Sequence, residues 1–278
     1  MSSKKRKFLF KFYYIGSKKF YGSQRQINFP TIESYLIEAL LNKKYITDVN
    51  TANFDVASRT DKYVSARGAA FSVIINKKPI LMELNSELPY EIGLWAYAHV
   101  PFDFSSRFDA LYRYYKYILP LGSRTSLNIS LIRKACKILE GTHDFKNFAK
   151  REKDNINTIR TLNMVSVNVK EDYLILGFKS KSYLRQQVRR MVKKLIEVGM
   201  KELELAEFLE LFNTSKNISY QPVNPEGLIL WDIVYNNTHQ FVIDPASNKR
   251  MIRYFHQREE ESDLQKILFH VLQHDNIG

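Results

Sequence analysis

The 278-residue chain is long enough for two packed subdomains or one large domain, and its 45% hydrophobic content excludes an extended disordered chain. It has 42 Lys and Arg against 29 Asp and Glu, a formal charge of +13, so we expect an anionic partner, with nucleic acid as a candidate. The single cysteine, Cys136, excludes an intramolecular disulfide and a thiolate metal cluster within one chain, which indicates a reducing, intracellular compartment.

The first predicted element is an aromatic-rich β-strand at residues 8–14, followed by a polar, cationic loop at residues 16–26. Lys11 interrupts the apolar run, which is too short for a signal or membrane segment. We therefore expect a soluble, cytoplasmic protein. Thr31 is a suitable N-cap for a helix, because the apolar residues that follow it recur at helical spacing.

The next apolar runs predict three strands. Two of them, at residues 55–58 and 68–75, flank a polar turn at residues 59–67, and the third covers residues 91–100. Residues 101–107 have little periodicity, so we expect the junction between two subdomains there.

The second half begins with an aromatic strand at residues 112–119. The further predicted elements are, in chain order, a helix at 129–140, a loop at 141–148, strands at 162–169 and 173–178, helices at 182–199 and 203–213, a strand at 228–234, and a mostly helical tail beyond Lys249. In the long helix, Arg185, Arg189 and Lys193 form a cationic row. Helices and strands without regular alternation predict the α+β class with antiparallel sheets.

The polar turn contains the most informative residue, Asp61. Arg59 and Lys62 lie beside it in the sequence and favour its ionised form, and an ionised carboxylate can act as a nucleophile or a base. From the residues alone, the alternative that Asp61 only caps a turn remains open.

The same segment resembles the R-T-D-x-x-V-x-A signature of the TruA family of tRNA pseudouridine synthases, and archaeal members most of all. The residues that match this signature are Arg59, Thr60, Asp61, Val64 and Ala66. Further blocks match in the family's order: Tyr14-x-Gly16 leading to Gln24-Arg25-Gln26, residues 113–117, Gly141-x-x-Asp144-Phe145, Val188-Arg189, and Gly227-Leu228-x-Leu230. The similarity covers roughly residues 8 to 235.

The resemblance implies the pseudouridine synthase fold, in which two related α+β subdomains with antiparallel sheets, flanked by helices, meet at a central cleft. Residues 1–107 would form the N-terminal catalytic subdomain, which carries Asp61, and residues 108–235 would complete the cleft. Residues 236–278 have no matched counterpart and are expected to form a mostly helical extension.

The resemblance also implies roles for individual residues. Asp61 matches the catalytic aspartate, Tyr115 the active-site tyrosine that packs against the target base and takes part in proton transfer, and Arg189 the arginine that pairs with the aspartate. Arg59 would help to move the target base out of its stack. The other expected RNA-binding residues are Gln24, Arg25, Arg67, Arg113, Arg185 and Arg190.

The implied reaction converts uridine to pseudouridine in the anticodon stem-loop of tRNA, at positions 38 to 40. Because an isomerisation neither gains nor loses atoms, no metal, nucleotide or redox cofactor is expected, and a homodimer is implied. Two alternatives are a noncatalytic RNA-binding protein on the same fold and a metal-dependent nuclease using paired carboxylates such as Asp103, Asp109 and Asp144. The chain departs from the family's pattern at Tyr63, where bacterial members have glycine, so we expect a different backbone shape beside Asp61.

Overall fold

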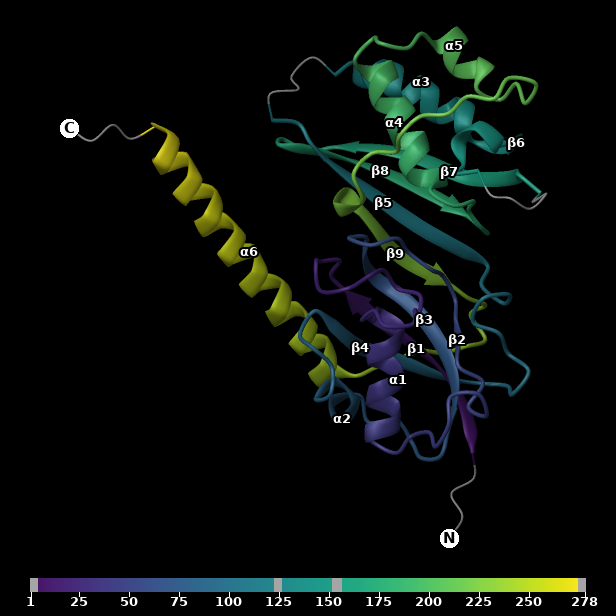
Figure 1. Ribbon diagram of the computed structural model, residues 1–278, viewed down its shortest axis with the longest axis vertical. Coiled ribbons are helices and arrows are strands. Elements are labelled where there is room, and N and C mark those ends of the chain that lie inside the picture. The colour runs from purple at the N-terminus through teal and green to yellow at the C-terminus, as the bar shows by residue number, and fades with distance from the viewer. Residues whose placement is uncertain (1–4, 123–126, 152–156, 275–278) are drawn as a thin grey trace.

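The protein is built on one continuous sheet that joins its two halves (Figure 1). The computed structural model describes residues 5–122, 127–151 and 157–274. Ten strands contribute, in the spatial order β10-β4-β1-β3-β9-β5-β8-β7-β6, with β2 paired to β3 outside this path. Their bounds are β1 Arg6–Tyr14, β2 Asp55–Val56, β3 Ser65–Ile75, β4 Ile92–Val100, β5 Tyr112–Pro120, β6 Gly141–Asp144, β7 Ile159–Val169, β8 Tyr173–Ser180, β9 Leu228–Val234 and β10 Val242–Ile243.

The two halves join at β9. This strand comes late in the chain, yet it lies between β3 of the first half and β5 of the second. It pairs parallel to β3 through Ser65 and Ala66, whereas it pairs antiparallel to β5. All other named strand pairs are antiparallel. The expected α+β fold with antiparallel pairing is confirmed, and the parallel step at β3 and β9 unites the sheets of the two halves.

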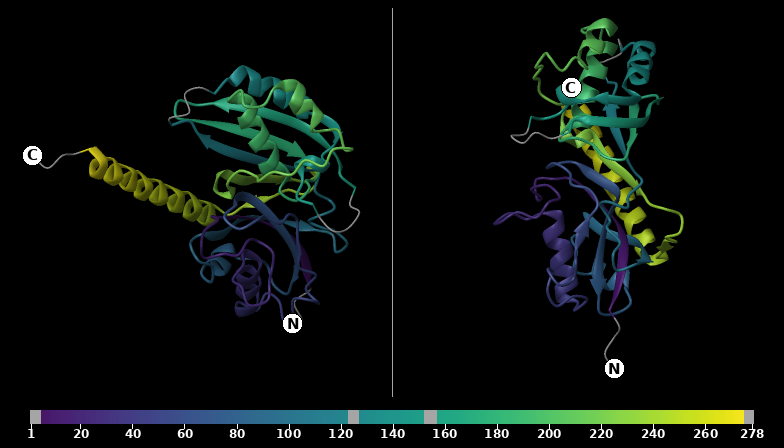
Figure 2. Two further views of the ribbon diagram at one scale, coloured as in Figure 1. Left: turned by 45° about the horizontal axis from the view of Figure 1, so that its top comes forward. Right: turned by 90° about the vertical axis from the view of Figure 1, so that its right-hand side faces the viewer.

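Helices cover one face of this sheet. They are α1 Ile32–Asn42, α2 Leu81–Asn85, α3 Ile129–Leu139, α4 Gln187–Gly199 and α5 Leu205–Glu210, while α6 Pro245–His274 extends from the body (Figures 1 and 2). Side chains on β5 alternate between the two faces, because successive residues of a strand point to opposite sides. Tyr115 and Tyr117 are buried under the helices, whereas Tyr114 and Lys116 lie on the other face and are only partly buried.

Most predicted elements are confirmed, with boundary shifts of a few residues. Two predictions were wrong. The expected loop at residues 141–148 contains β6, which pairs with β7, and a short 3-10 helix at Lys146–Phe148. The helix expected at 182–199 begins only at Gln187, because Gln186 has a φ of 60° and cannot continue a right-handed helix. The short elements α2 and β10 were not predicted. None of the described helices is both long and apolar enough to cross a membrane.

The N-terminus of α1 is tied to the loop that precedes it, because the N–H groups of Ile32 and Glu33 donate to the carbonyls of Gly22 and Ser23. Thr31 is fully buried, and its side chain accepts a hydrogen bond from the Ser34 backbone N–H at 3.2 Å. The Ser34 hydroxyl in turn accepts a hydrogen bond from the Thr31 N–H at 2.9 Å, which completes a capping box and confirms the expected N-cap.

We expect Thr31→Val to lower the free energy of unfolding by about 1 kcal/mol, because it leaves the Ser34 N–H without its cap while it preserves the buried methyl group. Thr31→Ser is the matched control, since it keeps the hydroxyl and removes only the methyl. Urea denaturation of both variants measures the difference. Equal stability of Thr31→Val and the wild type would contradict the capping role.

Candidate active site

A cleft of about 1170 Å³ opens on the helix-covered side of the sheet. Its walls come from segments far apart in the chain: the loop after β1, the segment from β2 to Val64, the turn before α4, and β5 at the floor. The cleft therefore lies where the two halves of the protein meet. Asp61, Tyr115 and Arg189 all line it.

The centre of the cleft is an ion pair between Asp61 and Arg189. Arg189 NH1 donates to Asp61 Oδ2 at 2.9 Å, and Arg189 Nε donates to the Val223 carbonyl at 2.8 Å. The Arg189 side chain is 11% exposed and the Asp61 side chain 37%. Arg189 is thus fixed by two partners at the wall, while the carboxylate that it orients faces the cleft.

The backbone beside Asp61 is fixed through Thr60. The Ser23 hydroxyl accepts a hydrogen bond from the Thr60 N–H at 2.7 Å, and the Ser23 N–H donates to the Thr60 carbonyl at 3.2 Å. The Thr60 hydroxyl lies 2.7 Å from the hydroxyl of Tyr14, a fully buried ring on β1. Since both sides of Thr60 are held, the next residue along, Asp61, has little freedom to move away from Arg189.

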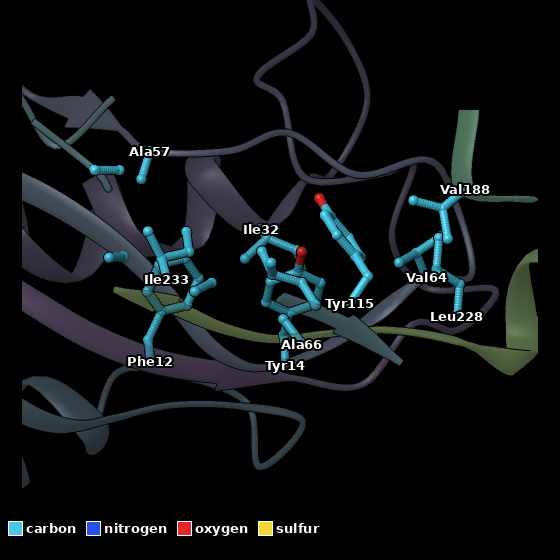
Figure 3. Close-up of a cluster of buried hydrophobic side chains, with 14 of the residues drawn as sticks. Phe12, Tyr14, Ile32, Ala57, Val64, Ala66, Tyr115, Val188, Leu228 and Ile233 are labelled. Atoms are coloured by element: carbon cyan, nitrogen blue, oxygen red, sulfur yellow. The ribbon is translucent and has the colours of Figure 1, made fainter. Parts of the chain in front are cut away.

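Tyr115 forms part of the apolar floor, among Val64, Val188 and Leu228 (Figure 3). Its ring meets that of Tyr183 edge to face at a centroid distance of 5.2 Å, and its hydroxyl lies 3.5 Å from the Ser58 hydroxyl. Burial raises the pKa of Tyr115, with a smaller opposite effect from the Ser58 hydrogen bond. The phenol therefore stays protonated at neutral pH and can act as a hydrogen-bond donor in the cleft.

The cationic residues expected from the sequence divide into three groups. Arg25, Arg59 and Arg185 are exposed and line the cleft, as does Gln24. Arg113 also lines it, but its guanidinium is buried and donates to the carbonyls of Ala57, Arg107 and Lys181 at 2.5 to 2.8 Å, so it links three backbone segments.

Arg67 and Arg190 do not line the cleft. Arg190 is 7% exposed and its guanidinium lies 5.2 Å from the Tyr220 ring centroid. Arg67 lies on the opposite face of the sheet, between the rings of Trp95 and Trp231.

The cleft also contains residues that the sequence did not single out. Arg107 and Arg160 line it and add to its positive charge, and Tyr183 contributes an aromatic wall. Arg160 reaches the cleft from β7, which lies beyond β5 and β8 in the sheet, so no local sequence pattern indicates its position. Tyr183 lies in the block that precedes Arg189, and its aromatic character was the one available signal.

The carboxylates of the described residues do not cluster in a way that suits a metal ion. In the part of the chain that the structure describes, no group of three or more His, Cys, Asp or Glu residues could hold one. Asp109 instead accepts a hydrogen bond from the Ser105 N–H at 2.8 Å, and Asp144 one from the Lys146 N–H at 3.0 Å, so both stabilise local turns. This distribution gives the nuclease alternative no support.

Comparison with known proteins agrees with the resemblance. A family model described as tRNA pseudouridine synthase matches residues 135–236. Proteins named tRNA pseudouridine synthase A are similar over most of their length. That of Methanosphaera stadtmanae is 34% identical over 94% of this chain and 98% of its own. That of Methanothermobacter thermautotrophicus is 34% identical over 89% of this chain and 88% of its own. That of Pyrococcus furiosus is 36% identical over 84% of this chain and 86% of its own.

The backbone of Tyr63, two residues after Asp61, has a φ of 69°, in the left-handed region that favours glycine. Gly16 packs against this residue so closely that a Cβ at Gly16 would lie 2.3 Å from the Tyr63 carbonyl carbon and oxygen. Where bacterial members have glycine, this chain therefore holds a tyrosine in a glycine-like conformation. The loop carries local strain beside the carboxylate.

We expect Tyr63→Gly to raise the free energy of unfolding by about 1 kcal/mol relative to Tyr63→Ala, because both remove the ring and only glycine relieves the left-handed backbone. Thermal and urea denaturation of the two variants measure this difference. If the alanine variant is as stable as the glycine variant, the strain at position 63 is negligible.

Proposed function

The chain belongs to the tRNA pseudouridine synthase family, and from this premise we propose that it isomerises uridine in the anticodon stem-loop of tRNA, at positions 38 to 40, with Asp61 as the catalytic carboxylate. The observation that carries the proposal is the ion pair of Asp61 and Arg189 inside a cationic cleft. A carboxylate in that position is oriented by the arginine and accessible to a nucleoside. These are the requirements for attack or for assistance in bond cleavage at a ribose.

In the proposed reaction the bond between N1 of uracil and C1′ of ribose breaks. The uracil rotates within the cleft, and a bond between its C5 and C1′ forms. C5 then loses its proton while N1 carries one, so product and substrate have the same atoms and no electrons are exchanged with an external carrier. Asp61 assists the cleavage step, and the hydrogen bond from Arg189 holds its carboxylate in the correct orientation throughout.

The surroundings of Tyr115 support its proposed role in holding the target base. Its buried ring, with Tyr183 at a right angle, gives the floor of the cleft an apolar surface on which a planar uracil can pack. The hydroxyl of Tyr115 is protonated and lies within the cleft, so it can pass a proton during the exchange at C5 and N1. The side chains of this floor, Tyr115, Val64, Val188 and Leu228, are buried, so water has limited access to it.

The arginines that line the cleft suit the proposed RNA partner. Arg25 and Arg59 come from the first half of the chain, and Arg107, Arg160 and Arg185 lie further along it. Cations on both sides of the cleft can neutralise phosphates that flank a nucleotide turned out of its stack. We further propose that the protein is cytoplasmic, as its composition indicates, and that it is a homodimer, as the family resemblance implies.

The decisive experiment incubates the purified protein with an unmodified tRNA transcript in EDTA and maps pseudouridine by carbodiimide modification. We expect modification in the anticodon arm by the wild type and none by Asp61→Ala, with tRNA affinity nearly unchanged because the carboxylate serves the chemical step. Binding without modification by the wild type would favour a noncatalytic RNA-binding protein. Shortened RNA that disappears in chelator would instead identify a metal-dependent nuclease, and equal loss of binding and turnover in Asp61→Ala would argue against its catalytic role.

The cationic rim predicts how binding depends on salt. We expect Arg25→Gln to reduce the slope of log K against log salt concentration by about one, because one phosphate contact is lost. Arg133→Gln is the matched control, since Arg133 is exposed on α3 and does not line the cleft. Fluorescence anisotropy over a series of salt concentrations measures both slopes. Equal slopes for the two variants would remove Arg25 from the RNA interface.

A further inference from the structure

The second half of α6 leaves the body of the protein. Its first turns pack on the sheet, where Met251 and Tyr254 contact Tyr13 of β1 and α6 contacts β4. From His256 to Gln273 every residue is exposed except Glu261, which is partly buried, and both figures show this part of α6 extending away from the rest (Figures 1 and 2). At 1.5 Å per residue the projecting segment is roughly 27 Å long.

This projecting segment has the composition of a helix that packs against something. Helices that make no tertiary contacts are marginal in water, and most helical stability in proteins comes from burying an apolar face. Such a face is present at spacings of three and four residues, consisting of Leu264, Ile267, Leu268, Val271 and Leu272, which are 42% to 70% exposed. Glu260 precedes Leu264 by four residues and so lies on the same stripe, at the end nearer the body.

A complementary surface lies on the face of the sheet opposite the cleft. Arg67 lies 5.1 Å from the Trp95 ring centroid and 5.7 Å from that of Trp231, and Lys116 lies 3.2 Å from the Trp231 centroid. Lys179 on β8 lies 4.3 Å from the Tyr112 centroid. We call Arg67, Trp95, Tyr112, Lys116, Lys179 and Trp231 the rear face.

The cations of the rear face are not neutralised. Among the described residues none of Arg67, Lys116 and Lys179 forms a salt bridge. Burial, and then the charge of Arg67, lower the pKa of Lys116. The same side of the sheet continues as an apolar area where Ile118 and Ile175 are cross-strand partners and Tyr173 is 39% exposed. The rear face thus offers cations and aromatic rings beside an apolar area.

We propose that the rear face receives the projecting half of α6 from a second copy of this chain. The stripe of α6 would cover the apolar area around Ile118 and Ile175, and Glu260 would approach the cations of the rear face. This arrangement gives both features a partner at once, the unsupported helix and the uncompensated cations. It specifies the interface of the homodimer in the proposed function, and it can fail while Asp61 remains the catalytic residue.

The exchange is reciprocal under a two-fold axis. Each chain carries one projecting helix and one rear face, so two chains satisfy both contacts and close the assembly. The charge balance favours a protein helix over RNA on this surface, because the carboxylates Glu260 and Glu261 lie on the same side of α6 as the apolar stripe and would face the same partner. Those carboxylates would repel phosphate groups.

The first test measures the mass of the full chain by sedimentation equilibrium. We expect the wild type to be a dimer of 32.7 kDa chains, and Ile267→Lys with Val271→Lys to weaken self-association at least roughly 30-fold, because both charges enter the apolar contact. The matched control is Ser262→Lys with Gln273→Lys, which adds the same charge to the opposite side of the same helix. Lys116→Glu and, independently, Lys179→Glu should weaken the dimer from the rear face, with thermal unfolding confirming that each variant is folded.

The second test mixes the helix variant with a rear-face variant, one of them fluorescently labelled. Each is monomeric alone, but together they retain one intact helix and one intact rear face on different chains, so a heterodimer of intermediate affinity should return. A monomeric wild type, or a dimer that the helix variants leave unchanged, would overturn the proposal. Failure of the mixture to associate would mean that the helix and the rear face do not contact each other across the dimer, and rear-face variants that lose tRNA affinity while they remain dimeric would assign that face to RNA. Neither of these last two outcomes is compatible with helix exchange.

Discussion

The ion pair of Asp61 and Arg189 sets the requirements that the rest of the fold meets. The two residues are 128 positions apart, and they lie on opposite sides of the line where the halves of the sheet join. Arg189 is buried, and a buried cation without its partner is costly. Its 2.9 Å contact with Asp61 therefore needs the two halves to be held in a fixed relation, which the continuous sheet provides through β9 between β3 and β5.

Several buried polar groups serve this alignment. Arg113 donates to backbone carbonyls from three segments, including that of Ala57, which directly follows β2 and leads to the Asp61 loop. Tyr14 and Ser23 hold Thr60 from the opposite side. The contact between Arg113 and the Ala57 carbonyl crosses between the two halves, and it leaves a buried donor and acceptor unsatisfied if the halves move apart. Opening the cleft would therefore cost hydrogen bonds in addition to apolar contacts.

The sequence predicted the local elements better than their arrangement. Strand 228–234 has its predicted bounds and Thr31 caps its helix as expected, since these features depend on short-range patterns. The position of β9 beside β3 could not be read from local patterns, because it depends on contacts between residues more than 150 positions apart. The residues alone also left Asp61 ambiguous between a turn cap and a catalytic acid. Resemblance to a family, and then the contact of Asp61 with Arg189, support the catalytic role that we propose.

Strand alternation connects the cleft to the rear face. Tyr115 and Lys116 are neighbours on β5, and the first points into the cleft while the second points to the other side. Leu228 and Trp231, three residues apart on β9, also point to opposite sides of the sheet. Leu228 lines the cleft, and the Trp231 ring lies beside the Lys116 ammonium group. A helix bound to the rear face would therefore pack on β5, which carries Tyr115, and on β9, which joins the two halves of the sheet. Because these strands are shared, subunit contact would stiffen the floor of the cleft without touching any residue that faces the RNA.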